Sequence, residues 1–466
     1  MQKIIAGISI VIAVLCMLLM GNFDHPLWLV SLNYSLFMIL WCNKREGFWE
    51  SPGMCVLFFG LFLRYSLLPL SYYFFGGYHL YTPDYFDEAV VLMIYEQIVT
   101  FVIIISTCKK LSSFGETNFG ESIKINKLFF ISVVAVLGLI VSFSSTSLDI
   151  GYAIIASSDL GEFFEVEVEE RSLGVSALMV VWTLSLFVLY VCIILFLKSI
   201  YQKKNNEVYV LLCIFFTLVL GFLTFINQSG AGMARWQTIV YTLSGFFLIT
   251  KVFKSRRKLV FRLLIAPLFA GVLFITAIKN GGMSDTGPNF LQAMEHTLGP
   301  ESMDAYLNGP DGISGSIKLK NESGLGISSL IHDIIHPIPI IHRYENVNLE
   351  TNLRYNKMVG KLGFIIPLQG QSMIYFGYLF APLLTILIIL LVRHFDKKYK
   401  QAHNFMIYFY GFCAIWFAMS MIFTDFTILS AWFFSPILPL YFIFAVFNKS
   451  RNKIRHKDYI QKICVN

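Results

Sequence analysis

The chain contains 466 residues, of which 56% are hydrophobic and only 14% are charged, and its mean hydropathy is +0.66. Soluble globular domains carry about 25% charged residues, so this composition excludes a soluble globular protein and indicates a lipid environment. The formal net charge is +7, but the basic residues lie between apolar runs and at the C-terminus, which excludes a nucleic-acid-binding patch. The eight cysteines are scattered without a CxxC pair, so we expect neither a thiol-redox motif nor a zinc knuckle. We expect no metal and no cofactor.

Apolar runs long enough to cross a bilayer recur along the chain and predict an all-α, polytopic membrane protein with about twelve transmembrane helices. The first run ends without a small-x-small cleavage site, so we interpret it as an uncleaved first helix. Tight connections leave the count between about ten and thirteen. The expected spans are 4–20, 27–42, 54–75, 89–107, 128–143, 174–198, 208–226, 237–252, 259–277, 372–392, 405–424 and 427–447.

The positions of lysine and arginine indicate how the predicted helices are oriented in the membrane. These residues concentrate in every second connection, whereas the alternate connections are poor in them and often acidic. The positive-inside rule therefore places both termini in the cytoplasm. The expected organisation is 1–277 with transmembrane helices 1–9 and a smaller periplasmic loop at 144–173, a large periplasmic loop with short helices at 278–371, transmembrane helices 10–12 at 372–447, and a basic cytoplasmic tail at 448–466.

The large loop is the segment where function is expected, because connections between spans need only a few residues. Within it, LQAMEHTLGPESMDAYL predicts a short helix with a Gly-Pro break, and NGPDGISGS predicts a turn. GISSLIHDIIHPIPIIHRYENV alternates apolar pairs with histidine, which predicts a position at the membrane surface.

Basic and acidic side chains gather in the second half of this loop. Arginine and lysine neutralise a diphosphate, while a carboxylate or histidine deprotonates a hydroxyl. The plainer alternative is a solvated loop held by surface ion pairs. The basic members are Arg343, Arg354, Lys357 and Lys361, and the acidic ones are Asp333, Glu345 and Glu350.

Two further external arginines are candidates. Arg235 follows the glycine-rich NQSGAGMA, where backbone N–H groups can approach an anion that the guanidinium chelates. The alternative is an interfacial arginine that reaches into the lipid headgroups. Arg171 closes the first external loop beside an acidic run that is either merely solvated or supplies a base.

His332 and His336 have i,i+4 spacing, which places both imidazoles on one face of a helix. Pro337 and Pro339 interrupt that helix at once and no HExxH pattern is present, so a polar lining near the membrane surface is favoured over a metal site.

Arg64 and Glu96 lie inside the third and fourth expected spans at similar depths. An isolated charge in hydrocarbon is costly, so each residue needs a partner and the two are predicted to pair. The pair is either purely structural or part of a polar cavity wall or proton path.

The whole arrangement resembles the bacterial O-antigen (Wzy-type) polymerases. The resemblance rests on the architecture with its late periplasmic loop, on SGAGMARWQTIVY, and on KLGFIIPLQGQSMIYFGYLFAPLLTILI. Some family members carry an arginine followed by ten residues and a glycine, whereas here Gly245 comes one place too early after Arg235.

The resemblance implies a glycosyltransferase of the bacterial inner membrane that joins undecaprenyl-diphosphate-linked repeat units. Donor and acceptor glycans, membrane lipids, a chain-length regulator and a flippase are the implied partners. The implied base is Glu345, Asp333 or His336, and the implied diphosphate-binding residues are Arg235, Arg343, Arg354, Lys357 and Arg171. An O-antigen ligase and a lipid-linked oligosaccharide flippase are the alternatives, although 362–376 lacks the histidine typical of ligases.

Overall fold

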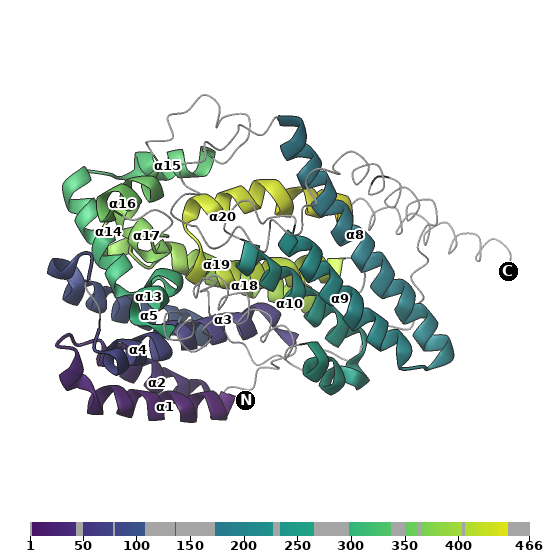
Figure 1. The fold of residues 1–466 in the computed structure, drawn as a ribbon, viewed down its shortest axis with the longest axis horizontal. Coiled ribbons are helices and arrows are strands. Elements are labelled where there is room, and N and C mark those ends of the chain that lie inside the picture. Colours follow the sequence, from purple (N-terminus) through teal and green to yellow (C-terminus); the bar gives the residue numbers. More distant parts are fainter. Residues whose placement is uncertain are drawn as a thin grey trace, which may run out of the picture. The chain divides into compact units, whose positions relative to one another are not determined.

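A computed structural model of the chain describes residues 2–42, 50–77, 80–107, 136, 173–226, 234–264, 298–336, 350–360, 365–402 and 406–445. These residues are almost entirely helical and include no β-strand (Figure 1), which confirms the predicted all-α class. They fall into two compact units, which are treated separately below. The first unit contains 1–114, 294–397 and 413–434, and the second contains the remainder.

Several helices are long and apolar enough to cross a membrane, which supports a membrane protein by length and composition. The five long ones are Pro52–Phe75, Pro83–Thr107, Leu184–Lys204, Tyr378–Gln401 and Met406–Phe423. Four shorter apolar helices are Lys3–Leu18, Trp28–Trp41, Val208–Gly221 and Ile239–Val252. The span at 128–143, apart from Val136, the second half of the span at 259–277, the loop residues 144–172 and the tail 448–466 lie outside the described residues.

The first unit begins with apolar helices, whose ends are set by proline, glycine and a carboxylate. Pro52 occupies the first turn of α3, where its missing N–H costs nothing. The two oxygens of Asp396 accept hydrogen bonds from the backbone N–H groups of Gly53 and Met54, both at 2.9 Å. Gly76 ends α4 in the left-handed region, with φ 75°. The elements are α1 (Gln2–Leu18), α2 (Trp28–Cys42), α3 (Pro52–Phe62), a π-helix (Leu63–Leu67), α4 (Leu68–Phe75) and α5 (Phe86–Thr107).

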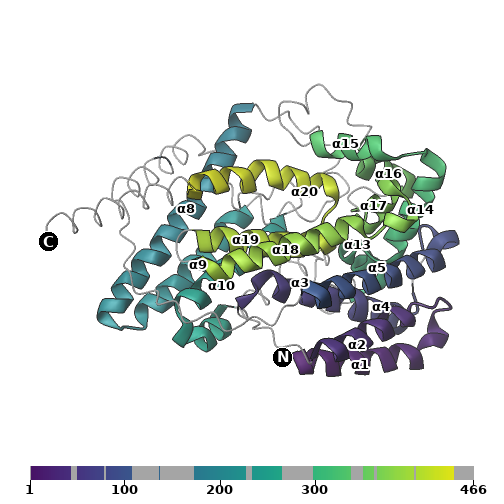
Figure 2. The ribbon, with the colours of Figure 1, turned by 180° about the vertical axis from the view of Figure 1, so that it is seen from behind.

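The described part of the large loop adds five short helices to the same unit. Helices α16, α17 and α5 each pack on α14 (Figure 2). The helices are α13 (Pro300–Leu307), α14 (Pro310–Ser323), α15 (Ile327–Ile335), α16 (Thr351–Val359) and α17 (Leu368–Phe376).

The predicted turn in NGPDGISGS is wrong, because Pro310 instead starts helix α14. The carboxylate of Asp304 accepts hydrogen bonds from the N–H groups of Asp311 (3.2 Å) and Gly312 (3.1 Å), and so caps the new helix. A β-carbon at Gly315 would stand 2.7 Å from the Tyr355 ring, so glycine permits this close packing. Tertiary contacts therefore override the local preference of glycine and proline for turns.

The expected span 372–392 is wrong at its start, because two helices replace its beginning. Helix α17 ends at Phe376, and Gly377 takes a φ of 87°, which favours glycine. The next apolar helix is Tyr378–Gln401, whose main part is α18 (Leu383–Gln401). It is followed by α19 (Met406–Phe423), α20 (Phe426–Trp432) and a second π-helix (Phe433–Ile437).

The second unit is built on α8 (Leu173–Lys204), α9 (Val208–Ile226) and α10 (Ala234–Val252). Rings fill its core, where Tyr241 and Phe412 stack with centroids 5.4 Å apart. Helix α8 runs past the expected end of its span at 198 and finishes on two lysines, whose charges suit a helix C-terminus.

Candidate functional site

Helix α15 packs on α17 and on α20 in the first unit (Figure 1), and acidic and imidazole groups cluster around it. The centre of this cluster is Asp333, which is fully buried. One carboxylate oxygen accepts a hydrogen bond from the N–H of Thr351 (3.2 Å), and the other accepts one from the hydroxyl of Tyr375. Thr351 is the first residue of α16, so Asp333 satisfies one of the unpaired N–H groups at that helix end.

Both histidines expected on one helix face flank this aspartate. The rings of His332 and His336 stack with centroids 5.2 Å apart. His332 Nδ1 lies 3.7 Å from Asp333 Oδ1, and His336 Nε2 lies 3.7 Å from Glu350 Oε2. The spacing of the two histidines therefore does place them together, with a carboxylate within reach of each.

Two more carboxyl groups complete what we call the carboxylate cluster, defined as Asp333, Glu350 and Asp425. Burial, with the nearby charge of Asp333, raises the pKa of Glu350 to about 7. Burial also raises the pKa of Asp425 to about 7, and the charges of Glu350 and Asp333 add to the effect. A carboxyl whose pKa is raised to about 7 is a stronger base than an ordinary carboxylate, which suits Glu350 and Asp425 to accept a proton from a hydroxyl.

Arg354 and Lys357 follow on α16. The N–H of Arg354 donates to the carbonyl of Glu350 (3.1 Å), so Arg354 lies one helical turn after Glu350, the N-cap of α16. Arg354 is half-buried and Lys357 is exposed. A proton acceptor and a cation therefore stand on adjacent turns, which is the combination that the sequence predicts for this loop.

The remaining predicted site residues are Arg343, Glu345, Lys361, Arg171 and Arg235. Arg343, Glu345, Lys361 and Arg171 lie outside the described residues. Arg235 is the second residue of α10, at the helix start that the sequence predicts, and it belongs to the second unit.

Asp425 and Tyr375 are cluster residues that the sequence reasoning missed. Asp425 is the N-cap of α20, and its side chain accepts a hydrogen bond from the N–H of Ile428 (2.7 Å). The Thr-Asp pair before an apolar run is a signal for such a cap. Nothing in the sequence indicates that this cap faces Asp333.

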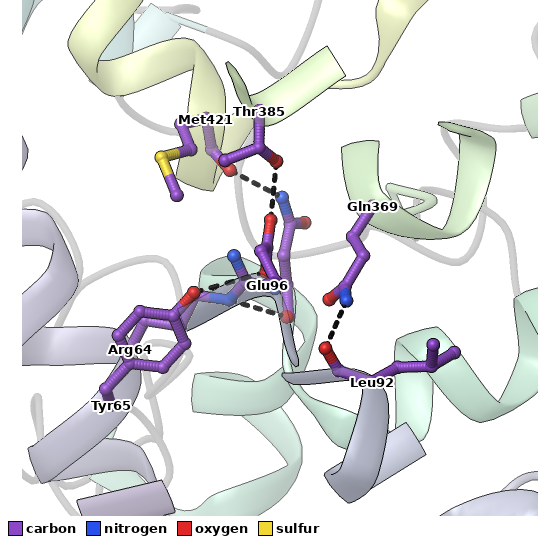
Figure 3. Close-up of polar contacts among 8 residues, drawn as sticks. Arg64, Tyr65, Leu92, Glu96, Gln369, Thr385 and Met421 are labelled. Atoms are coloured by element: carbon purple, nitrogen blue, oxygen red, sulfur yellow. Dashed lines mark hydrogen bonds and ion pairs between the residues drawn. The ribbon is translucent and has the colours of Figure 1, made fainter. Parts of the chain in front are cut away.

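The predicted pair of Arg64 and Glu96 is confirmed, with Arg64 Nη2 3.0 Å from Glu96 Oε2 and both side chains 1% exposed (Figure 3). The glutamate also accepts hydrogen bonds from the hydroxyls of Tyr65 (3.1 Å) and Thr385 (2.5 Å). Arg64 Nε donates to the carbonyl of Asn308 (3.1 Å). The pair thus joins α3–α4, α5 and α18 to the end of α13.

Arg64 lies in the π-helix Leu63–Leu67, a rare geometry that recurs at functional sites. Close by, Gln369 of α17 extends toward α5, and its Nε2 donates to the carbonyl of Leu92 (2.5 Å, Figure 3). Within the described part of the chain, the side-chain oxygens of Gln369 and Asn308 are buried without a hydrogen-bond partner. This centre is enclosed and charge-balanced, so it suits anchoring of the loop helices better than contact with a large substrate.

The carboxylate cluster predicts how stability depends on pH. The ordinary pKa values of Glu350 and Asp425 are 4.5 and 3.8, and both are raised to about 7 in the folded chain. The folded chain therefore binds protons more tightly than the unfolded chain. The contribution of these two carboxyls to the free energy of unfolding is fully present below about pH 4 and is lost as the pH rises through 7. We expect the melting temperature in detergent to fall between pH 5 and pH 8, and to fall less in the E350Q/D425N chain. An equal slope in both chains would show that these carboxyls do not titrate as described.

No family model, no curated protein and no solved structure matches this chain.

Proposed function

We propose that the chain is a glycosyltransferase of the bacterial inner membrane that joins undecaprenyl-diphosphate-linked oligosaccharide repeat units into O antigen or a related surface polysaccharide. The observation that carries the proposal is the carboxylate cluster with Arg354 one turn from Glu350, in a segment that the sequence predicts to be periplasmic. The predicted architecture and the SGAGMARWQTIVY segment, which resemble the Wzy-type polymerases, support the same reading.

The proposed reaction assigns the following roles. Glu350, which lies in the carboxylate cluster with Asp333 and next to His336, accepts the proton of the acceptor hydroxyl. The hydroxyl oxygen forms a bond to the anomeric carbon of the donor, and the bond from that carbon to the diphosphate oxygen breaks. The electron pair leaves with undecaprenyl diphosphate, whose charge Arg354 and Lys357 offset. Arg235, Arg343 and Arg171 stay predicted diphosphate contacts, and Glu345 stays a predicted base.

An O-antigen ligase uses the same leaving group, but 362–376 contains no histidine of the kind that ligases carry before the re-entry helix. A transporter is favoured by one observation, the buried Arg64–Glu96 pair. The long loop with its cluster of proton acceptors favours the polymerase over a transporter, and the missing histidine favours it over a ligase.

Deletion of the gene in its native host, followed by gel analysis of the surface glycan, tests the proposal. A polymerase predicts that the ladder collapses to core plus a single repeat unit. Long chains that persist on the carrier lipid would instead identify a ligase. Absence of any repeat unit in the periplasm would identify a transporter.

A further inference from the structure

Helix α15 is amphipathic, but it exposes isoleucines and buries polar side chains, which is the opposite of what a helix at a water-facing surface does. Ile327 and Ile331, one turn apart, are 61% and 54% exposed. Ser329, Asp333 and His336, on the opposite side, are buried. The exposed residues of Ile327–Ile335 are Ile327, Ser328 and Ile331, and its one carboxylate, Asp333, is buried, so the outward face of α15 is mainly apolar and carries no acid or base.

Neighbouring helices from the same loop follow the ordinary pattern. Helix α14 buries Ile313 and Ile317 and exposes Glu322, while α16 buries Tyr355 and exposes Lys357. The reversal therefore belongs to α15 alone among these three. A helix that turns its isoleucines outward and its aspartate inward is matched to an apolar exterior.

The position of α15 explains why its surroundings are apolar. It packs on α20, which begins just after α19 ends at Phe423, and on α17, which ends just before the apolar helix that starts at Tyr378. Both partners thus mark ends of helices that are long enough to span a membrane. At the second of these ends Leu379 and Phe380 are exposed by 72% and 52%, so that helix end also presents apolar side chains outward.

We propose that the outward face of α15 lies in the membrane interface in contact with lipid, so that the helix seats the carboxylate cluster at the level of the lipid headgroups. The apolar face holds the helix on the acyl boundary, and the polar face keeps Asp333 and His336 inside the protein. The inference does not depend on glycosyl transfer. If the proposed function holds, it also places the proton acceptors at the depth where a lipid-linked diphosphate lies.

The test uses the full chain in vesicles of phosphatidylethanolamine and phosphatidylglycerol, with its native cysteines replaced. A nitroxide is attached at I331C on the outward face of α15, at I327C one turn earlier, and at E322C on α14 as the matched control. Collision with oxygen, which concentrates in lipid, is compared with collision with a water-soluble nickel chelate. We expect the ratio of oxygen to nickel collisions to be several-fold higher at 331 and 327 than at 322.

Ratios at 331 and 327 that are as low as those of a water-exposed position such as 322 would overturn the proposal, because α15 would then face water. If the cysteine-free chain does not fold, a photoreactive phenylalanine derivative at position 331 of the native chain tests the same contact with lipid. Its crosslinks to lipid support the proposal. A crosslinked dimer of the chain, without lipid adducts, would show that a second copy covers this face and would equally overturn it.

Discussion

Replacement of Arg64 by alanine is expected to destabilise the chain by about 3–5 kcal/mol, because it leaves Glu96 charged and buried without its partner. Both side chains are 1% exposed, so water cannot take the place of the guanidinium. The hydrogen bond from Arg64 Nε to the Asn308 carbonyl is lost as well, which frees the end of α13. We expect R64A to unfold at a much lower temperature in detergent and to accumulate poorly in cells.

The matched control removes both charges. R64M/E96L leaves no uncompensated ion, so it is expected to recover most of the lost stability. Loss of an exposed charge in K203A should change the free energy of unfolding by less than about 0.5 kcal/mol. If R64A is as stable as K203A, the pair does not anchor the loop helices to the apolar helices.

Replacement of Glu350 by glutamine is expected to slow polymer formation by about 10²–10⁴-fold, the usual contribution of a positioned general base. The amide keeps the size of the side chain but cannot accept the proton of the acceptor hydroxyl. The rate at which the glycan ladder grows, after induction of the variant in a deletion strain, measures the effect. E322Q, an exposed glutamate on α14, is the control and should retain the wild-type rate.

Thermal unfolding separates this loss from a folding defect. Because the pKa of Glu350 is raised to about 7, a neutral glutamine should not lower the melting temperature at pH 7. E350Q with a wild-type melting temperature and a wild-type ladder rate would remove Glu350 from the reaction and leave Asp333 or His336 as the base.

The sequence was sufficient where local rules decide the outcome. Arg64 and Glu96 are opposite charges in two successive apolar runs, so the cost of an isolated charge in lipid predicts their contact. The i,i+4 spacing of His332 and His336 predicts a shared face in the same way. Helical class and an apolar surface follow from composition alone.

The composition of the carboxylate cluster and several helix ends depend on tertiary packing, which could not be predicted from the sequence. Asp425 joins the cluster because α20 packs on α15, a contact between segments far apart in the chain. Gly312 and Gly315 read as turn residues, yet they let Pro367 and Tyr355 approach helix α14. Gly377 interrupts an apolar run that hydropathy treats as continuous. The functional assignment stays a proposal that rests on the resemblance and on the cluster.

The most direct test of the account is a reconstituted reaction. The purified chain in proteoliposomes is mixed with undecaprenyl-diphosphate-linked repeat units as the sole substrate. We expect a ladder of longer lipid-linked glycans with release of undecaprenyl diphosphate, both strongly reduced in E350Q and in R354A. A folded wild-type chain that leaves the repeat unit unchanged would contradict the proposal that this protein itself forms the glycosidic bond.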